Sequence, residues 1–333
     1  MSKIGVMICG HGSRSKEAVN EFANLQVQLA ERFPEYEVEY GFLEFALPVL
    51  STGLDKLCER GVDHVLSVPG MLFAAGHVKN DIVSVLNDYQ AAHADPNFKI
   101  EFAGPLDIDH KMLMAARARI EEAEAAAGTK VPREETLLMV VGRGTSDPDA
   151  NGNVSKIGRM IAEGMSFAWG EVCYSGVTYP LVAPGLEHAA KLGYRRIIVF
   201  PYFLFTGVLV ERIYSITDEV AAKTPEIEFI KAKYLSDQIS VIDTFEERVR
   251  GILSGENNMN CQLCKYREQI IGFEAHHGLP QEGHHHHVEG IGTDEDSQDK
   301  PDQSHDGHSH HHPSHPHPEH PHGPGRRNPS AVD

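Results

Sequence analysis

The stretch MICGHGSR at residues 7–14 decides the fold, because it recurs as MVVGRGTS at residues 139–146. Both copies join a short apolar run to a polar loop that contains glycine, which is typical of a buried strand and the loop at its carboxyl end. A longer pair keeps the same separation of 132 residues: GLDKLCERGVDHVLSVP (53–69) matches GLEHAAKLGYRRIIVFP (185–201). The sequence therefore predicts two copies of one structural unit.

Outward from residues 7–14, short β-branched runs alternate with segments of helical periodicity. The predicted strands of the first copy are 4–9, 38–42, 64–68 and 99–102, and the predicted helices are 16–33, 48–60, 78–92 and 110–127. This alternation predicts an α/β fold in which helices cover both faces of a parallel sheet, and the series starts again at Thr136. We therefore predict two α/β domains, residues 1–130 and 131–254, followed by a tail at 255–333.

Composition excludes several classes of protein. The chain has 333 residues with 30 Lys+Arg against 48 Asp+Glu, and its net charge of −18 disfavours binding to nucleic acid. No apolar stretch is long enough to span a membrane, and the start MSKIGVMICG lacks the pattern of a signal peptide. Five scattered cysteines are too few for a disulfide framework, which favours a cytoplasmic location.

The tail is rich in His, Pro, Gly, Asp and Glu, and 15 of the 21 histidines fall between His276 and His322. We predict that it is disordered, because it has too few apolar residues to offset the entropy of ordering. Clustered imidazoles bind Co, Ni, Cu or Zn, whereas the alternative is a tail that only solvates the protein.

Two histidines are candidates for one shared site. His11 follows the first predicted strand, and His77 lies in PGMLFAAGHVKNDI (69–82) after the third. Ligands bind at the carboxyl ends of strands in open parallel sheets. In the second copy Arg143 stands in place of His11 and, after a gap of one residue, Val208 in place of His77. Chemistry confined to the first copy explains this asymmetry better than two loop histidines that only satisfy the backbone, and two imidazoles suit Co, Ni, Fe or Zn.

Glu44, in FLEFALP, can reach the same crevice as a proton acceptor or a third metal contact, or it is an edge or helix-capping acid. The Gly10-x-Gly12 pair lacks the third glycine of a dinucleotide fingerprint, because Ser15 occupies that place. The sequence therefore predicts no nucleotide.

Cys261 and Cys264 form a C-x-x-C in MNCQLC, beyond the predicted domains. A pair at this spacing can hold a metal or part of an iron–sulfur cluster, but it supplies half of a four-cysteine set. From the residues alone, a cluster or zinc site and an incidental pair in a linker both stay open.

Together, GHGSR, FLEFALP, VPGMLFAAGHVKNDI, the duplication, MNCQLC and the histidine-rich end resemble the long form of the CbiX-type sirohydrochlorin cobaltochelatases, which are class II chelatases. The resemblance covers roughly residues 1–270. It implies two chelatase-like (flavodoxin-like) domains that face a tetrapyrrole cleft, with His11 and His77 as metal ligands and a [4Fe–4S] cluster at Cys261 and Cys264. It also implies that Glu44 is the family's acidic cleft residue, a match that is less distinctive than the match of the two histidines. Some relatives carry the histidine pair in the other half.

The resemblance implies that the chain inserts Co²⁺ into sirohydrochlorin, with release of two protons, in cobalamin biosynthesis. His11 and His77 would hold the ion, His11 would accept a ring proton, and Glu44 would assist. A carboxylate-rich substrate needs basic groups, for which Arg14, Lys79, Arg143 and Arg212 are candidates, with Ser13 beside them. Arg143 in particular is expected to pair with a substrate carboxylate.

Two alternatives remain: a sirohydrochlorin ferrochelatase of sirohaem synthesis, and a metal-storage or metallochaperone protein whose tail is the functional part. The partners expected are sirohydrochlorin and a divalent metal, with no nucleic acid and no membrane. The sequence leaves a homodimer open.

Overall fold

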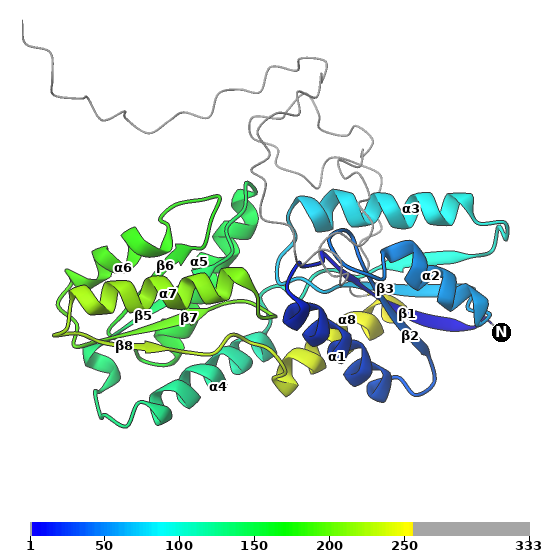
Figure 1. The fold of residues 1–333 in the computed structure, drawn as a ribbon. Helices are drawn as coiled ribbons and strands as arrows, with labels where there is room; N and C mark the ends of the chain where they lie inside the picture. The colour runs from blue at the N-terminus through cyan, green and yellow to red at the C-terminus, as the bar shows by residue number, and fades with distance from the viewer. Residues whose placement is uncertain (1, 256–333) are drawn as a thin grey trace, which may run out of the picture. The chain divides into compact units, whose positions relative to one another are not determined.

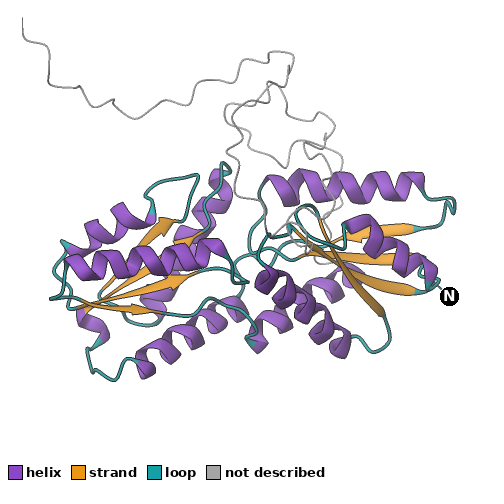
Figure 2. Cartoon of the chain, in the orientation of Figure 1, coloured by secondary structure: helices purple, strands orange, loops and turns teal. Residues whose placement is uncertain are grey.

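The computed structural model describes residues 2–255. Cys261, Cys264 and the histidine-rich tail lie outside the described residues. Figure 2 shows the helices and strands of the described part, which form two α/β halves.

The first half contains one four-stranded parallel sheet. Its elements are β1 (Ile4–Gly10), α1 (Lys16–Arg32), β2 (Glu37–Phe42), α2 (Leu50–Glu59), β3 (His64–Pro69), a π-helical turn η1 (His77–Asp81), α3 (Ile82–Ala92), β4 (Lys99–Phe102) and α4 (His110–Ala126). The strand order is β2-β1-β3-β4, so the first strand of the chain lies inside the sheet.

The second half repeats this plan after a short 3₁₀ turn, η2 (Arg133–Glu135). Its elements are β5 (Thr136–Gly142), α5 (Pro148–Gly164), β6 (Trp169–Tyr174), α6 (Val182–Ala190), β7 (Arg196–Pro201), α7 (Val208–Lys223), β8 (Glu228–Lys231) and α8 (Ile239–Ser254). The order β6-β5-β7-β8 matches that of the first sheet strand for strand. The predicted α/β fold with an internal duplication is confirmed.

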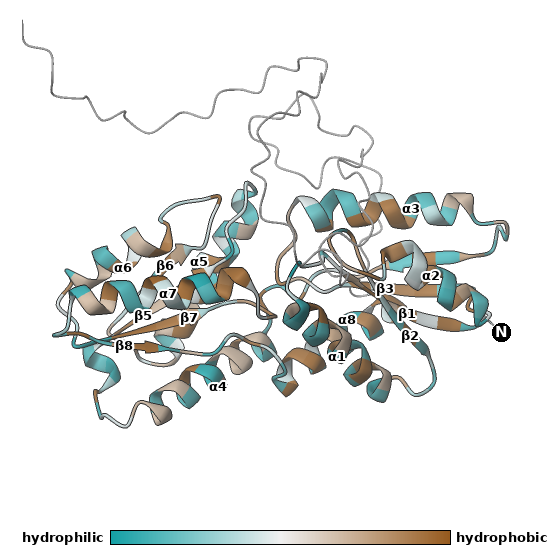
Figure 3. Ribbon diagram, viewed as in Figure 1, coloured by the Kyte–Doolittle hydropathy of each residue, from teal (hydrophilic) through white to brown (hydrophobic). Residues whose placement is uncertain are grey.

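The strands are apolar because both faces of each sheet are covered by helices. In β5 all seven residues are buried, and Figure 3 shows hydrophobic residues along the strands of both sheets. In the first half α2 and α3 pack on one face through residues such as Leu54 and Leu86, against Met7 and Val65 of the strands. No helix in residues 2–255 has the length and apolar character needed to cross a membrane.

The last helix of each repeat packs with the other half. Helix α8 contacts α1 and β3 of the first half, whereas α4 contacts α5 and β8 of the second (Figure 1). One buried core consequently joins the halves, with Leu66 and Met112 in the same cluster as Leu138 and Phe245. The predicted boundaries at residues 130 and 254 mark the repeat along the chain. Their use as domain limits stays a prediction, because α4 and α8 each pack on the half formed by the other copy of the repeat.

Glycine is required where each first strand enters its loop. Gly12 has φ +103° and Gly144 has φ +82°, a region that residues with a side chain rarely adopt. A Cβ atom on Gly12 would lie 1.7 Å from the carbonyl oxygen of Glu44, and one on Gly144 would lie 1.9 Å from that of Gly176. In each half, the loop after the first strand can approach the loop after the second strand this closely only because it contains this glycine.

Candidate active site

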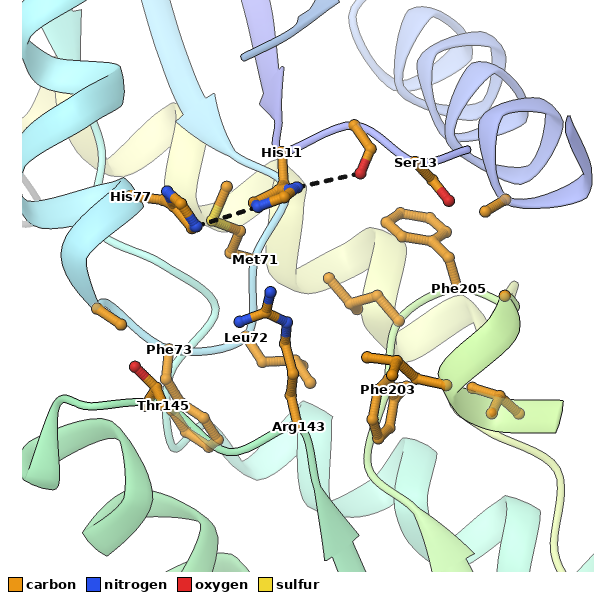
Figure 4. Close-up of a pocket in the computed structure, with 18 of the residues that line it drawn as sticks. His11, Ser13, Met71, Leu72, Phe73, His77, Arg143, Thr145, Phe203 and Phe205 are labelled. Atoms are coloured by element: carbon orange, nitrogen blue, oxygen red, sulfur yellow. Dashed lines mark hydrogen bonds between the residues drawn. The ribbon is translucent and has the colours of Figure 1, made fainter. Parts of the chain in front are cut away.

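A cavity of about 460 Å³ lies at the carboxyl ends of the strands of both halves. Its polar lining from the first half comes from the loop after β1 and from η1, and the loops after β3 and β7 supply mostly apolar side chains. The labelled part of the lining is seen in Figure 4: His11, Ser13, Met71, Leu72, Phe73, His77, Arg143, Thr145, Phe203 and Phe205. Apolar walls with a few polar groups are typical of sites that hold an organic ligand.

The loop that carries His11 is fixed to the loop that carries Glu44. Leu43 N–H donates to the Gly10 carbonyl at 2.8 Å, and Glu44 N–H donates to the His11 carbonyl at 3.0 Å. These bonds, together with the close approach at Gly12, bring the Glu44 carboxylate beside the His11 ring, where Oε1 lies 3.4 Å from Nε2. The ring of Phe45 stacks with the His11 ring, with centroids 5.9 Å apart.

His77 is the first residue of η1, in which Ile82 N–H donates to the His77 carbonyl five residues earlier. Such single π-helical turns are frequent at functional sites. Asn80, Asp81 and Val78 of this turn are buried, whereas the His77 side chain keeps 28% of its surface exposed. The turn therefore holds His77 at the cavity wall while the rest of it packs inward.

The structure brings the two histidines together. Their Nε2 atoms lie 3.0 Å apart, and the rings meet edge to face with centroids 4.3 Å apart (Figure 4). Two nitrogens bound to one ion at about 2.1 Å and at a right angle to each other are also about 3.0 Å apart. The spacing of the pair thus fits two adjacent ligands of one metal ion.

The outer nitrogen of each ring faces an atom that can only accept a hydrogen bond. His11 Nδ1 lies 3.1 Å from the Gly12 carbonyl oxygen, and His77 Nδ1 lies 2.9 Å from Asp81 Oδ2. With hydrogen on both Nδ1 atoms, the two Nε2 atoms face each other as acceptors, an arrangement that one shared metal ion satisfies.

Glu44 is placed to serve the same position. Its side chain is 12% exposed, and it lies beside His11 without being part of the cavity lining. Among residues 2–255 no group of three or more His, Cys, Asp or Glu side chains is arranged to hold an ion. Two imidazoles with one carboxylate at longer range form an open site, which suits an ion that must leave the protein.

Arg143 reaches toward the histidine pair from the second half (Figure 4). Desolvation lowers the pKa of its guanidinium from the ordinary value, and the charge of Glu44 opposes this shift. Even so, the group is cationic at neutral pH, because an arginine guanidinium stays protonated in proteins. Within the described part of the chain its guanidinium forms no ion pair within 4.0 Å, so a positive charge faces the cavity.

Ser13 and Arg14 also line the cavity, and Arg14 lies over the Phe45 ring with its Cζ 5.3 Å from the centroid. The prediction that Lys79 and Arg212 face the cavity was wrong, because neither residue is part of its lining. Lys79 Nζ is 2.6 Å from Asp147 Oδ2, which engages it in an ion pair between the halves. Arg212, on the first turns of α7, is exposed and is not part of the lining.

The second half has neither the two histidines nor the glutamate at the corresponding positions. Counting by equivalent strands, Arg143 replaces His11, Gly176 replaces Glu44 and Val208 replaces His77. Thr145, which corresponds to Ser13, was not predicted, although the repeat gave the signal for it. Asp81 was missed as well, and its spacing of four residues from His77 could have indicated it.

A search against protein-family models matches this chain twice to the model described as CbiX, at residues 5–123 and 137–252. The chain belongs to the CbiX family. The two matches coincide with the two copies of the repeat, which confirms the resemblance drawn from the sequence.

Individual proteins and a solved structure are also similar to this chain. A sirohydrochlorin cobaltochelatase of Priestia megaterium is 34% identical over 272 residues, which are 82% of this chain and 87% of that protein. A sirohydrochlorin ferrochelatase of the same organism is 27% identical over 76% of this chain and 92% of its own length. The crystal structure of the sirohydrochlorin chelatase SirB from Bacillus subtilis subspecies spizizenii in complex with cobalt superposes with a TM-score of 0.62. It is 25% identical and covers 77% of this chain and 99% of its own.

Proposed function

We propose that this protein is a sirohydrochlorin chelatase that inserts Co²⁺. The observation that carries the proposal is the pair of Nε2 atoms of His11 and His77, 3.0 Å apart at the wall of a cavity with apolar sides. The relatives named as sirohydrochlorin chelatases support the substrate. Co²⁺ is proposed ahead of Fe²⁺ because the cobaltochelatase relative is 34% identical and the ferrochelatase relative 27%.

The walls of the cavity suit a flat macrocycle. The loops after β3 and β7 present corresponding apolar residues, Leu72 and Phe73 from one half and Leu204 and Phe205 from the other. The ring would lie between these walls, so that its central nitrogens face the histidine pair. Arg143, Arg14 and Ser13 would then bind the carboxylates at its edge, and Arg143 suits this role because arginine pairs with carboxylates through two parallel hydrogen bonds.

His11 and His77 deliver the ion in this proposal. The Nδ1 atoms are held by the Gly12 carbonyl and Asp81, so Nε2 is the nitrogen that each ring would present to Co²⁺. When the ion passes to the ring nitrogens, each Nε2 lone pair becomes free again. His11 then accepts one ring N–H proton, and Glu44, 3.4 Å from the same nitrogen, assists its transfer and the removal of the second.

A [4Fe–4S] cluster at Cys261 and Cys264 is part of the proposal, although both residues lie outside the described residues. No step of the reaction is assigned to it. A ferrochelatase is the second candidate, since ferrochelatases are among the relatives. Storage or delivery of metal is less well supported, because it needs neither the paired histidines nor the apolar cavity.

The decisive experiment is anaerobic incubation of the full chain with sirohydrochlorin and Co²⁺, Ni²⁺ or Fe²⁺ in turn, with insertion followed by the absorbance of the ring. We expect the fastest insertion with Co²⁺, relative to a protein-free control for each ion. Faster insertion of Fe²⁺ would favour the ferrochelatase. Rates equal to the protein-free controls for all three ions would contradict a chelatase.

A further inference from the structure

We infer that Asp81 is a positioning residue that fixes His77 with its Nε2 lone pair toward the cavity. This inference rests on the proposed function, since it assigns a role within the same site. Asp81 closes the π-helical turn that His77 opens, and its Oδ2 accepts a hydrogen bond from His77 Nδ1 at 2.9 Å.

The burial of Asp81 needs an explanation. It is 5% exposed, and a carboxylate is stable in such surroundings only when hydrogen bonds compensate the loss of water. His77 Nδ1 supplies one donor, and Asn80 Nδ2 supplies another to Oδ1 at 3.0 Å. The second donor comes from the adjacent residue, whereas the contact with His77 links Asp81 to a residue that lines the cavity.

The repeat supplies an internal comparison. Counted from the first residue of each helical segment, Val208 corresponds to His77 and Arg212 to Asp81. Arg212 is exposed, so the second half keeps neither the histidine nor a buried acid at these positions. The acid thus occurs in the half that has a histidine for it to hold.

The chemical effect follows from the two nitrogens of imidazole. A carboxylate at Nδ1 keeps hydrogen on that nitrogen, orients the ring and makes Nε2 a stronger donor to a metal ion. Without the acid, His77 can carry its hydrogen on Nε2, which is then unable to bind Co²⁺. The removal of such partners in metal sites lowers affinity or activity by roughly 10–100-fold.

The test compares Asp81→Asn, Asp81→Ala, His77→Ala and the double variant His77→Ala/Asp81→Ala in the full chain. The control is Asp88→Asn, which removes an exposed acid from α3. We expect Asp81→Ala to lower kcat/KM for Co²⁺ about 10–100-fold with the KM for sirohydrochlorin unchanged, and Asp81→Asn to lie between it and the wild type. In the His77→Ala background, loss of Asp81 should have no further effect. An undiminished effect there, or no effect in the single variants, would overturn the inference.

A spectroscopic measurement separates this inference from the proposed function. In protein labelled with ¹⁵N-histidine, the Nδ1–H of His77 should give a downfield proton signal that disappears in His77→Ala and in Asp81→Ala. If the wild type shows this signal but inserts no ion, the proposed function fails and the pairing stands. If the signal persists in Asp81→Ala, the positioning role fails whether or not the protein is a chelatase.

Discussion

Arg119 on α4 and Arg248 on α8 make the same contact in opposite directions. Arg119 Nη2 donates to the Leu235 carbonyl at 3.0 Å, in the loop after the last strand of the second half. Arg248 Nη2 donates to the Leu106 carbonyl at 2.7 Å, in the equivalent loop of the first half. Each arginine also pairs with an acid there, Arg119 with Asp237 and Arg248 with Asp109. Helix α4 is therefore bound to the second half, and helix α8 to the first half, by equivalent arginines.

Arg119→Ala or Arg248→Ala should each lower the free energy of unfolding by about 2–3 kcal/mol, because each removes charge-assisted hydrogen bonds to a backbone carbonyl. Arg117→Ala is the matched control, since Arg117 lies on α4 but its side chain is 54% exposed in a surface pair with Glu121. This variant should cost about 0.5 kcal/mol or less. Urea denaturation of the three variants measures the difference, and equal losses would contradict a fastening role.

Asp109 should make the protein sensitive to acid. Burial raises the pKa of its carboxyl, but hydrogen bonds from Lys111 and the charges of Lys111 and Arg248 outweigh burial, so that its pKa is lower than usual. A group whose pKa is depressed by folding stabilises the folded state above the pKa of the unfolded chain. That stability is lost as the pH falls below about 4 and through the folded-state pKa.

Asp109→Asn keeps an acceptor for the Lys111 N–H at the start of α4 but removes the charge. It should be less stable than the wild type at pH 7, with a smaller loss of stability as the pH falls below about 4. Denaturation at a series of pH values tests this, with Asp88→Asn as the control for removal of an acid. Parallel pH profiles of the wild type and Asp109→Asn would be the contrary result.

His11→Ala and His77→Ala should each reduce the rate of metal insertion by about 100-fold or more while the protein stays folded, since acid–base groups contribute about that factor. His110→Ala is the control, because the side chain of His110 is 80% exposed at the start of α4. Initial rates at saturating sirohydrochlorin and Co²⁺ give the comparison. Near-normal rates in both variants would remove these histidines from the mechanism.

Arg143→Ala should raise the KM for sirohydrochlorin more than it lowers kcat, because the guanidinium is assigned to a carboxylate at the edge of the ring. Arg143→Lys should recover part of the affinity, since it keeps the charge but loses the paired hydrogen bonds. Arg212→Ala controls for loss of an exposed positive charge. A fall in kcat alone, with an unchanged KM, would place Arg143 in the chemical step instead.

A chain that ends at Gly255 should fold and insert metal. Gly255 closes α8 with φ +74°, and its N–H donates to the Ile252 carbonyl. It should match the full-length rate at saturating Co²⁺ and fall behind when Co²⁺ is scarce, because a tethered tail raises the local ion concentration. It should also lack any iron–sulfur absorbance, since Cys261 and Cys264 are removed.

The control is a chain that ends at Gln238, before α8. We expect it to fail to fold cooperatively, because α8 packs on β3 and α1 of the first half. Circular dichroism and thermal melting compare the two truncations. If the chain that ends at Gly255 were inactive at every Co²⁺ concentration, the tail would be needed for more than the supply of Co²⁺.

The sequence by itself determined the strands, the duplication and the half that carries the histidines, because these depend on local periodicity and on which residues recur at a fixed spacing. His11 and His77 could be assigned to one site since parallel strands bring their carboxyl ends to one edge. Tertiary structure decided the 3.0 Å contact between the two rings, the ion pair that engages Lys79 and the place of Asp81 behind His77.

The exchange of α4 and α8 was likewise decided by tertiary packing. Both helices have the same apolar periodicity whichever sheet they cover, so nothing local distinguishes packing on the helix's own half from packing on the other. The carbonyl groups that Arg119 and Arg248 bind, those of Leu235 and Leu106, lie more than 100 residues away along the chain. Contacts over such a distance are selected by the shape of the completed core, and that core exists once both halves have folded together.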